Sequence, residues 1–171
     1  MITGKYPSLR LRRSRKNSWS RRLVSENNLS PSDFILPIFL IEGKNKTQPI
    51  KSMPGVYRYS IDRLGIILDR AIKNDIPMVA LFPYTSSKLK NDLGSEALNE
   101  DNLVCRAIKY IKKRYKNKIG IMCDVALDPY TTHGHDGILK SNNIMNDETI
   151  EILIQQSLLQ AQMGCDVLAP S

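Results

Sequence analysis

Four short apolar segments recur along this chain at intervals of roughly forty residues, centred near Leu36, Ala80, Ile121 and Val167. One stretch with helical periodicity lies in each interval. Short apolar runs beside helical segments are typical of parallel strands that are covered on both faces. Repeating strand-then-helix units leave two architectures open, a doubly wound open sheet and a (β/α)8 barrel. The chain has no G-x-G-x-x-G motif, which weakens the dinucleotide-binding version of the open sheet.

The periodicity and the turn residues predict the elements and their limits. The expected strands are 34–41, 77–82, 119–128 and 167–169, and the expected helices are 60–74, 101–115 and 146–164. Ser60 and Asn146 are the expected N-caps, and Gly164 is a natural helix stop. The segments 42–56 and 84–100 are expected to be mostly loop. For the last helix, the pattern predicts an inward apolar face made of Ile150, Leu153, Ile154, Leu158 and Ala161.

The stretch 119–137 combines a buried strand with a polar loop. Its strand is expected to carry Asp124 and Asp128, and this even spacing would place both carboxylates on the same side of the sheet. Pro129 ends the strand, and the loop after it is dense in ionisable groups, namely His133, His135 and Asp136. Parallel α/β proteins place their chemistry at such carboxyl ends of strands. The segment is therefore the candidate site.

Each of these acidic residues also has an ordinary structural interpretation. Asp128 before Pro129 could be a turn residue, and Asp136 followed by Gly137 is a common turn pair. Asp124 could be a buried acid that pairs with a polar group of a neighbouring strand. Carboxylates suit Mg²⁺ and other hard cations, whereas the two nearby imidazoles keep a transition-metal site open.

Charge and cysteine content bound the class of protein. The net charge is +8, and eight Lys or Arg residues lie between Lys5 and Arg22 with no acidic residue among them. Such a run is compatible with nucleic-acid binding, an anionic surface, a transit peptide or a disordered tail. The three widely spaced cysteines favour buried thiols in a reducing cytoplasm over a zinc or disulfide framework. No apolar run approaches the ~20 residues of a membrane span.

Several motifs together resemble one enzyme family, delta-aminolevulinic acid dehydratase, also called porphobilinogen synthase. They are, in order, S-W-S-R-R-L-V-S-E-N from Ser18, P-I-K-S-M-P-G-V from Pro49, V-A-L-F-P from Val79, G-S-E-A-L-N from Gly94, D-V-A-L-D-P-Y-T-T-H-G-H-D-G from Asp124, N-D-E-T from Asn146 and D-V-L-A-P-S from Asp166. The resemblance implies an α/β fold, the (β/α)8 TIM barrel. A whole barrel needs eight strands and about 250 residues, so the chain would hold four βα units, half a barrel.

The resemblance also implies a reaction and its participants. The family condenses two molecules of 5-aminolevulinate to porphobilinogen with loss of two waters, in haem biosynthesis. It forms Schiff bases on two lysines, and both would lie beyond Ser171, so this chain is expected to be inactive alone. Lys88 and Lys140 lie in loops whose context does not suggest burial, and neither is promoted to a catalytic role.

By resemblance, Asp124 and Ser171 would line the substrate pocket, and Asp128 and Asp136 would bind the metal. Zinc-dependent members carry three cysteines in this loop, where this chain has Ala126, Asp128 and Asp136. Soft thiolates select zinc. We therefore expect Mg²⁺, or a monovalent cation, rather than Zn²⁺, and no organic cofactor.

The expected organisation is a basic N-terminal arm over 1–30 and half of a barrel domain over 31–171. By resemblance, the arm wraps a neighbouring subunit of an allosteric homooctamer in the cytoplasm, with neither nucleic acid nor membrane as a partner. Two alternatives stay open: an inactive half-length remnant, and a basic RNA-binding or assembly module that uses the arm. The second would show steep salt dependence of nucleic-acid binding.

Overall fold

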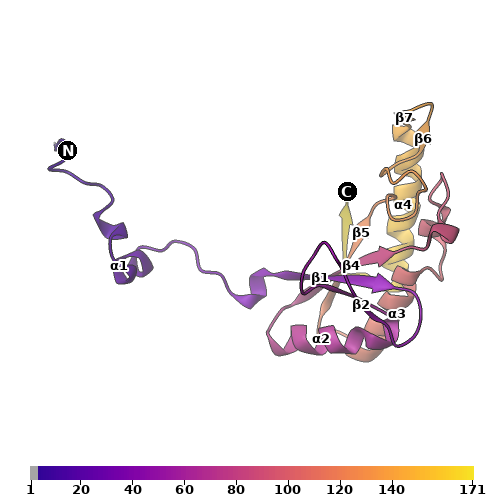
Figure 1. The fold of residues 1–171 in the computed structure, drawn as a ribbon, viewed down its shortest axis with the longest axis horizontal. Helices are drawn as coiled ribbons and strands as arrows, with labels where there is room; N and C mark the ends of the chain where they lie inside the picture. The colour runs from indigo at the N-terminus through magenta and orange to yellow at the C-terminus, as the bar shows by residue number, and fades with distance from the viewer. Residues whose placement is uncertain (1–3) are drawn as a thin grey trace. The chain divides into compact units, whose positions relative to one another are not determined.

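The computed structural model describes residues 4–171, which form two compact units divided between Ser30 and Pro31. In the first unit the described residues form a single 3₁₀ turn at Arg13–Arg15 and a short helix α1 at Ser18–Leu23. The Ser20 hydroxyl donates to the Asn17 carbonyl (3.0 Å), which closes the first turn of α1. The second unit carries the sheet and the long helices (Figure 1).

A six-stranded sheet in the order β2-β3-β1-β4-β5-β8 forms the frame of the second unit (Figure 1). Its four main strands run parallel and are neighbours in chain order. They are β1 (Ile35–Ile41), β4 (Met78–Tyr84), β5 (Gly120–Val125) and β8 (Val167–Pro170). These are the four predicted strands. Pro37 is tolerated inside β1 because β3 pairs with that strand only at Phe39 and Leu40, so no ladder bond needs an N–H from the proline on that side.

Three helices connect the main strands: α2 (Leu64–Lys73), α3 (Leu103–Tyr115) and α4 (Asn146–Met163). The Asn102 side chain caps α3 by accepting from the Cys105 N–H (2.8 Å). Gly164 ends α4 with φ +103°, as predicted. Neither predicted N-cap makes a capping bond: Ser60 instead accepts from the Lys46 N–H (2.9 Å) and precedes a 3₁₀ turn, Ile61–Arg63, while Asn146 is already the first helical residue.

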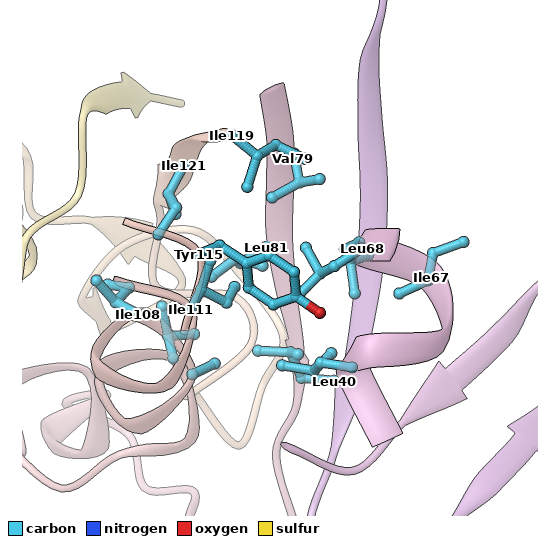
Figure 2. Packing of buried hydrophobic residues seen from close by; sticks show 14 of the residues in the cluster. Leu40, Ile67, Leu68, Val79, Leu81, Ile108, Ile111, Tyr115, Ile119 and Ile121 are labelled. Carbon is cyan, nitrogen blue, oxygen red and sulfur yellow. The ribbon is translucent and has the colours of Figure 1, made fainter. Parts of the chain in front are cut away.

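The main core lies between one face of this sheet and helices α2 and α3. Val79 and Leu81 from β4 and Ile121 from β5 are at most 1% exposed. They belong to one cluster with Leu68 of α2 and Tyr115 of α3, whose side chains Figure 2 shows between the helices and the strands. Full burial of each such aliphatic side chain contributes about 1.5–3 kcal/mol. The Tyr115 hydroxyl reaches the core edge and donates to Asp69 Oδ1 (2.8 Å), which joins the two helices.

Short strands form in and beside the segment 42–56, which was predicted to be mostly loop. β2 (Thr47–Pro49) and β3 (Tyr57–Tyr59) form an antiparallel pair inside and just after the 42–56 segment, and β3 extends the sheet beside β1. A separate two-residue pair, β6 (Leu139–Lys140) and β7 (Asn143–Ile144), precedes α4. Three-residue strands between Gly and Pro residues show almost no alternation, which is why the pattern does not predict them. The 84–100 segment has two short 3₁₀ turns, Ser87–Leu89 and Ser95–Leu98.

The orientation of α4 differs from the prediction. Ile150, Ile154 and Leu158, which were assigned to its inner face, are 45%, 46% and 59% exposed. The buried side chains of the helix are Thr149, Gln156, Leu159 and Gln160. The helix carries apolar residues around most of its circumference, so periodicity could not identify the inward face. The exposed side, together with Val125 and Pro170, lines an apolar groove of about 350 Å³.

The alternation along β5 shows which way the sheet would close. Ile121, Cys123 and Val125 are buried on the helix side, whereas Met122 and Asp124 are only partly buried on the other side. On that second face Phe39 of β1 lies opposite Phe82 of β4, with ring centroids 5.8 Å apart. Four parallel strands with helices over their outer face and a partly open inner face form one half of a (β/α)8 barrel, as expected.

Two adjacent leucines of α4 test this orientation. Replacing buried Leu159 (7% exposed) with alanine should lower the free energy of unfolding by about 2–5 kcal/mol. The same change at Leu158 (59% exposed) should alter it by no more than about 0.5 kcal/mol. Urea unfolding of the two variants measures the difference between the two losses in free energy of unfolding. The comparison is matched because both variants replace leucine with alanine in the same helix. Equal losses at both positions would contradict the orientation of α4.

Candidate functional site

Asp124 lies near the carboxyl end of β5, on the face of the sheet away from α2 and α3. The parallel ladder places it opposite Ala169 of β8, and the side chain is partly buried. Burial raises the pKa of Asp124, and the negative charges of Asp128 and Asp136 raise it further. The three aspartates therefore lie close enough to act on one another electrostatically.

Asp128 lies in a turn and not on the strand, which corrects the expectation of two acids on one strand. β5 ends at Val125, and the Leu127 carbonyl then accepts the N–H groups of both Tyr130 and Thr131 (2.9 Å each). The Leu127 carbonyl is therefore used by the turn and is not available for a hydrogen bond to a neighbouring strand, so β5 does not extend to Asp128. Asp128 is exposed, yet its pKa is raised, first by partial desolvation and then by the charge of Asp136.

Asp136 closes the loop onto the strand end. Its Oδ1 accepts the backbone N–H of Leu127 (2.6 Å), so a carboxylate nine residues further along the chain fixes the start of the turn. Beneath the loop, buried Leu127, Tyr130 and Ile138 form a second small hydrophobic cluster with Ala97. The structure thus brings Asp128 and Asp136 together.

The two histidines are engaged within the loop. His133 Nδ1 accepts the backbone N–H of His135 (3.1 Å), and His133 Nε2 lies 3.3 Å from the Asp92 carbonyl oxygen. The two rings lie 5.5 Å apart between centroids. Both nitrogens of His133 therefore have backbone partners, and a metal would have to displace one of them.

Two buried amides that sequence analysis missed hold the end of β5. Gln156 and Gln160 of α4 are 1% and 3% exposed. Their Nε2 groups donate to the carbonyls of Ala126 (3.2 Å) and Asp124 (3.0 Å). Successive turns of one helix therefore orient the backbone at the site. Glutamine on a helix is usually read as solvent-facing, so only its spacing of four residues could have suggested a shared role.

A neighbouring segment, Lys90 and Asn91, supports the loop from outside. The Asn91 N–H donates to the Tyr130 carbonyl (3.3 Å), and the Thr132 N–H donates to the Asn91 carbonyl (3.2 Å). Lys90 Nζ lies 3.4 Å from the backbone oxygen of Asp128. The charge of Lys90 lowers the pKa of the Asp128 carboxyl group, which opposes the increase caused by desolvation and by Asp136. Lys90 is the basic residue that the structure brings to the candidate site, and its loop position gave no sequence signal.

The remaining sequence candidates lie as follows. Ser171 is exposed at the end of β8, and its N–H donates to the Val125 carbonyl (3.2 Å). Lys88 is exposed, and Lys140 is exposed and forms an ion pair with Glu148 (2.6 Å). Neither lysine lies in a buried environment.

The donor atoms bear on which ion the loop could hold. Within residues 4–171, no three His, Cys, Asp or Glu side chains are grouped so as to hold a metal ion. A closed zinc site needs three or four protein ligands, whereas Mg²⁺ keeps several waters and uses one or two carboxylates. The carboxylates of Asp128 and Asp136 are hard oxygen donors of the kind that Mg²⁺ accepts, and they differ from the soft thiolates that select zinc. In the same part of the chain, none of the helices has the length and apolar character required to cross a membrane.

Comparisons with known proteins converge on one family. The sequence model described as Delta-aminolevulinic acid dehydratase matches residues 8–171. The chain is 52% identical over 164 residues to the Delta-aminolevulinic acid dehydratase of Bradyrhizobium diazoefficiens, covering 96% of this chain and 46% of the relative. It is 42% identical over 164 residues to that of Chlamydia pneumoniae, covering 96% and 49%.

A solved structure agrees with these sequence matches. The crystal structure of delta-aminolevulinic acid dehydratase from Toxoplasma gondii ME49, in complex with the reaction product porphobilinogen, superposes with a TM-score of 0.89 at 38% identity. The match covers 95% of this chain and 46% of that one, so the chain spans about half the length of these relatives. With the half-barrel, the carboxylate loop at its carboxyl edge and a family match over residues 8–171, the chain belongs to the delta-aminolevulinic acid dehydratase family.

Proposed function

We propose that this chain forms the N-terminal half of the barrel of an enzyme that condenses two molecules of 5-aminolevulinate to porphobilinogen with loss of two waters. The observation that carries the proposal is the group of Asp124, Asp128 and Asp136 at the carboxyl edge, within a chain that matches the family over residues 8–171. Carboxyl edges of barrel strands carry the catalytic groups of such enzymes. The loop is built for charge recognition, since its acids act on one another.

In this proposal the chain supplies binding and orientation. Asp124, on the inner face of the sheet, would hold the protonated amino group of a substrate molecule, and Ser171, at the end of the adjacent strand, would line the same pocket. The family activates its ketone substrate on lysines. We assign these to the part of the relatives that this chain does not match, because Lys88 and Lys140 are exposed. Tested alone, the chain is expected to be inactive.

We further propose that Asp128 and Asp136 bind Mg²⁺ or a monovalent cation in preference to Zn²⁺. Both carboxylates lie on one loop, and the charge of Asp136 raises the pKa of Asp128, an unfavourable proximity that a cation would relieve. Such an ion supplies fixed positive charge for oxygen atoms of the substrate. Hard oxygen donors favour these ions over zinc.

The basic unit up to Ser30 is proposed as an arm that binds a neighbouring subunit, by analogy with the family's homooctamer. Its eight basic residues between Lys5 and Arg22 carry the charge for contact with an acidic surface of another subunit. A cytoplasmic location is proposed from the three free cysteines of residues 4–171, which suit a reducing compartment.

A chimera tests the catalytic proposal. Residues 8–171 would replace the matching half of the Bradyrhizobium diazoefficiens relative, and porphobilinogen formation from 5-aminolevulinate would be measured. The chimera should be active, and Asp124→Asn should lower kcat/KM by about 10- to 100-fold, the equivalent of one lost charged hydrogen bond. Asp75→Asn is the matched control, because Asp75 follows α2 at the opposite edge of the sheet. A chimera that folds but is inactive would contradict the proposal and favour the alternative that the chain is an inactive half-length remnant.

The cation proposal predicts a pH-dependent stabilisation by Mg²⁺. The pKa of Asp128 is raised in the folded chain, so its protonated form favours folding below the unfolded pKa, and that stability is lost as pH rises through the folded pKa. Mg²⁺ binds the ionised form. It should therefore raise Tm at pH 7. At an Mg²⁺ concentration of a hundred times Kd, the free energy of unfolding should rise by about 2.7 kcal/mol. Near pH ~4, Mg²⁺ should have little effect.

Variants separate this site from general ionic effects. Asp128→Asn should lose the Tm response to Mg²⁺ and, without Mg²⁺, should be at least as stable as the wild type at pH 7, because a repelled charge is removed. Asp75→Asn should keep the full response. An unchanged response in Asp128→Asn would place the ion elsewhere.

The arm proposal predicts a change of assembly. Deleting 9–23 from the chimera should reduce the size of the oligomer measured by sedimentation, while far-ultraviolet circular dichroism should show that the barrel stays folded. If the deletion variant sediments as the same oligomer, the arm does not hold subunits together. Binding of RNA that weakens steeply with salt and disappears with the deletion would favour the RNA-binding alternative.

A further inference from the structure

Two cysteines that the proposed reaction does not use lie side by side in the structure. Cys123 is a fully buried residue of β5, and Cys165 lies partly exposed between Gly164 and the start of β8. They are separated by more than forty residues in sequence and by the whole of α4, yet Cys165 packs against the hydrophobic cluster that contains Cys123, and the two thiols interact. β5 and β8 are adjacent parallel strands with Cys123 opposite Leu168, so the turn that precedes β8 lies beside β5.

The turn between α4 and β8 directs Cys165 towards β5. Asp166 anchors this turn: its Oδ2 accepts the Ile121 N–H (2.8 Å), and its carboxylate forms an ion pair with Lys112 of α3 (2.6 Å). The Cys165 Sγ lies 3.4 Å from the Ile121 carbonyl and 3.0 Å from that of Val167. The thiol is therefore held against the strand that carries Cys123.

We propose that Cys123 and Cys165 form a redox-active dithiol, which closes to a disulfide when the protein meets a peroxide. The proposal does not depend on the enzymatic activity proposed above. It rests on one buried thiol of β5 and one partly exposed thiol in the turn before β8, whose sulfur lies 3.4 Å from the Ile121 carbonyl oxygen of the same β5.

The two thiols have different tasks in this reaction. The hydrogen bond from the Cys123 thiol lowers the pKa of Cys165, and this bond together with burial raises the pKa of Cys123. Cys165 is also the more accessible of the two, so it is the thiol that a peroxide reaches as thiolate.

The chemistry balances in two steps. The Cys165 thiolate attacks one oxygen of hydrogen peroxide, the O–O bond breaks, and a sulfenic acid and one water form after proton uptake. The Cys123 sulfur then attacks the sulfenic sulfur, the S–O bond breaks, and the thiol proton leaves with the hydroxyl group as a second water. The two thiols are oxidised and the peroxide is reduced. A dithiol reductant reverses the change by exchange.

Cys105 provides an internal comparison. It is fully buried in α3, near enough to Cys123 to act on it electrostatically, and burial raises its pKa to about 11. It is neither accessible nor ionised at neutral pH. The structure therefore favours Cys165, and not Cys105, as the partner of Cys123, although Cys105 is closer in sequence.

Closing the bond must move the turn. A disulfide requires a sulfur–sulfur distance of about 2.05 Å, shorter than a hydrogen-bonded thiol contact. Cys123 is fixed in the strand ladder, whereas Gly164 with φ +103° precedes Cys165 in a turn. Oxidation should therefore pull the turn at 164–166 towards β5.

Peptide mapping tests the proposal on the full folded chain. The reduced protein would be exposed to hydrogen peroxide, its free thiols alkylated, and the sample digested with trypsin without reductant. Each cysteine lies on its own tryptic peptide: 91–106, 119–140 and 141–171. We expect a mass loss of two hydrogens and a link between 119–140 and 141–171, which dithiothreitol reverses.

Variants and a denatured control show which cysteines form the bond and whether its formation requires the native fold. Cys105→Ser should form the same link, Cys165→Ser should form none, and Cys123→Ser should leave a sulfenic acid on Cys165 that a dimedone probe captures. In urea the shorter loop favours a bond between Cys105 and Cys123. The proposal is overturned if the native protein gives that link, gives the same mixture as in urea, or gives no link while Cys165 accumulates higher oxides.

Discussion

Burial of one face of a parallel sheet under α2 and α3 is the interaction on which the rest of this half-barrel depends. Leu68 of α2, Ile111 of α3 and Leu81 of β4 are at most 1% exposed and belong to one continuous cluster. This packing fixes which side of each strand faces the helices, and every residue of the opposite alternation then lies on the inner face. Asp124 is placed on the inner face because Cys123 and Val125 are buried on the outer one.

The parallel direction of the strands has a second consequence, because all four main strands end at the same edge. The loop that follows β5 is held there by backbone contacts from three directions: from Asp136 within the loop, from Asn91 after β4, and from Gln156 and Gln160 of α4. Acidic groups held so closely raise the pKa values of Asp124 and Asp128. The fold therefore stores electrostatic repulsion at this edge, which a bound cation or an ammonium group would relieve.

The apolar side of α4 shows the limit of this packing. In this chain the apolar side of α4 lines an open groove together with Val125 and Pro170. The buried residues on the side of α4 that faces the sheet include two amides, Gln156 and Gln160, and one leucine, Leu159. The same helix thus positions the site through polar contacts and exposes most of its aliphatic surface. The structural relative covers about twice the length of this chain, in keeping with a half-barrel whose outer helix has a second apolar side.

The sequence by itself determined the four parallel strands, the three long helices and the segment that carries the candidate acids. Its apolar runs and turn residues are local signals, and such signals suffice where burial is complete, as at Val79 or Ile121. Only the tertiary structure decided that Asp128 lies in a turn, that Leu159 and not Leu158 faces inward, and that Gln156, Gln160 and Lys90 support the loop. Each of these depends on contacts between residues far apart in the chain, and neither side-chain chemistry nor periodicity encodes such contacts locally. The proximity of Cys123 and Cys165 has the same origin, since it depends on the pairing of β5 with β8 and on the turn that Asp166 anchors to Ile121.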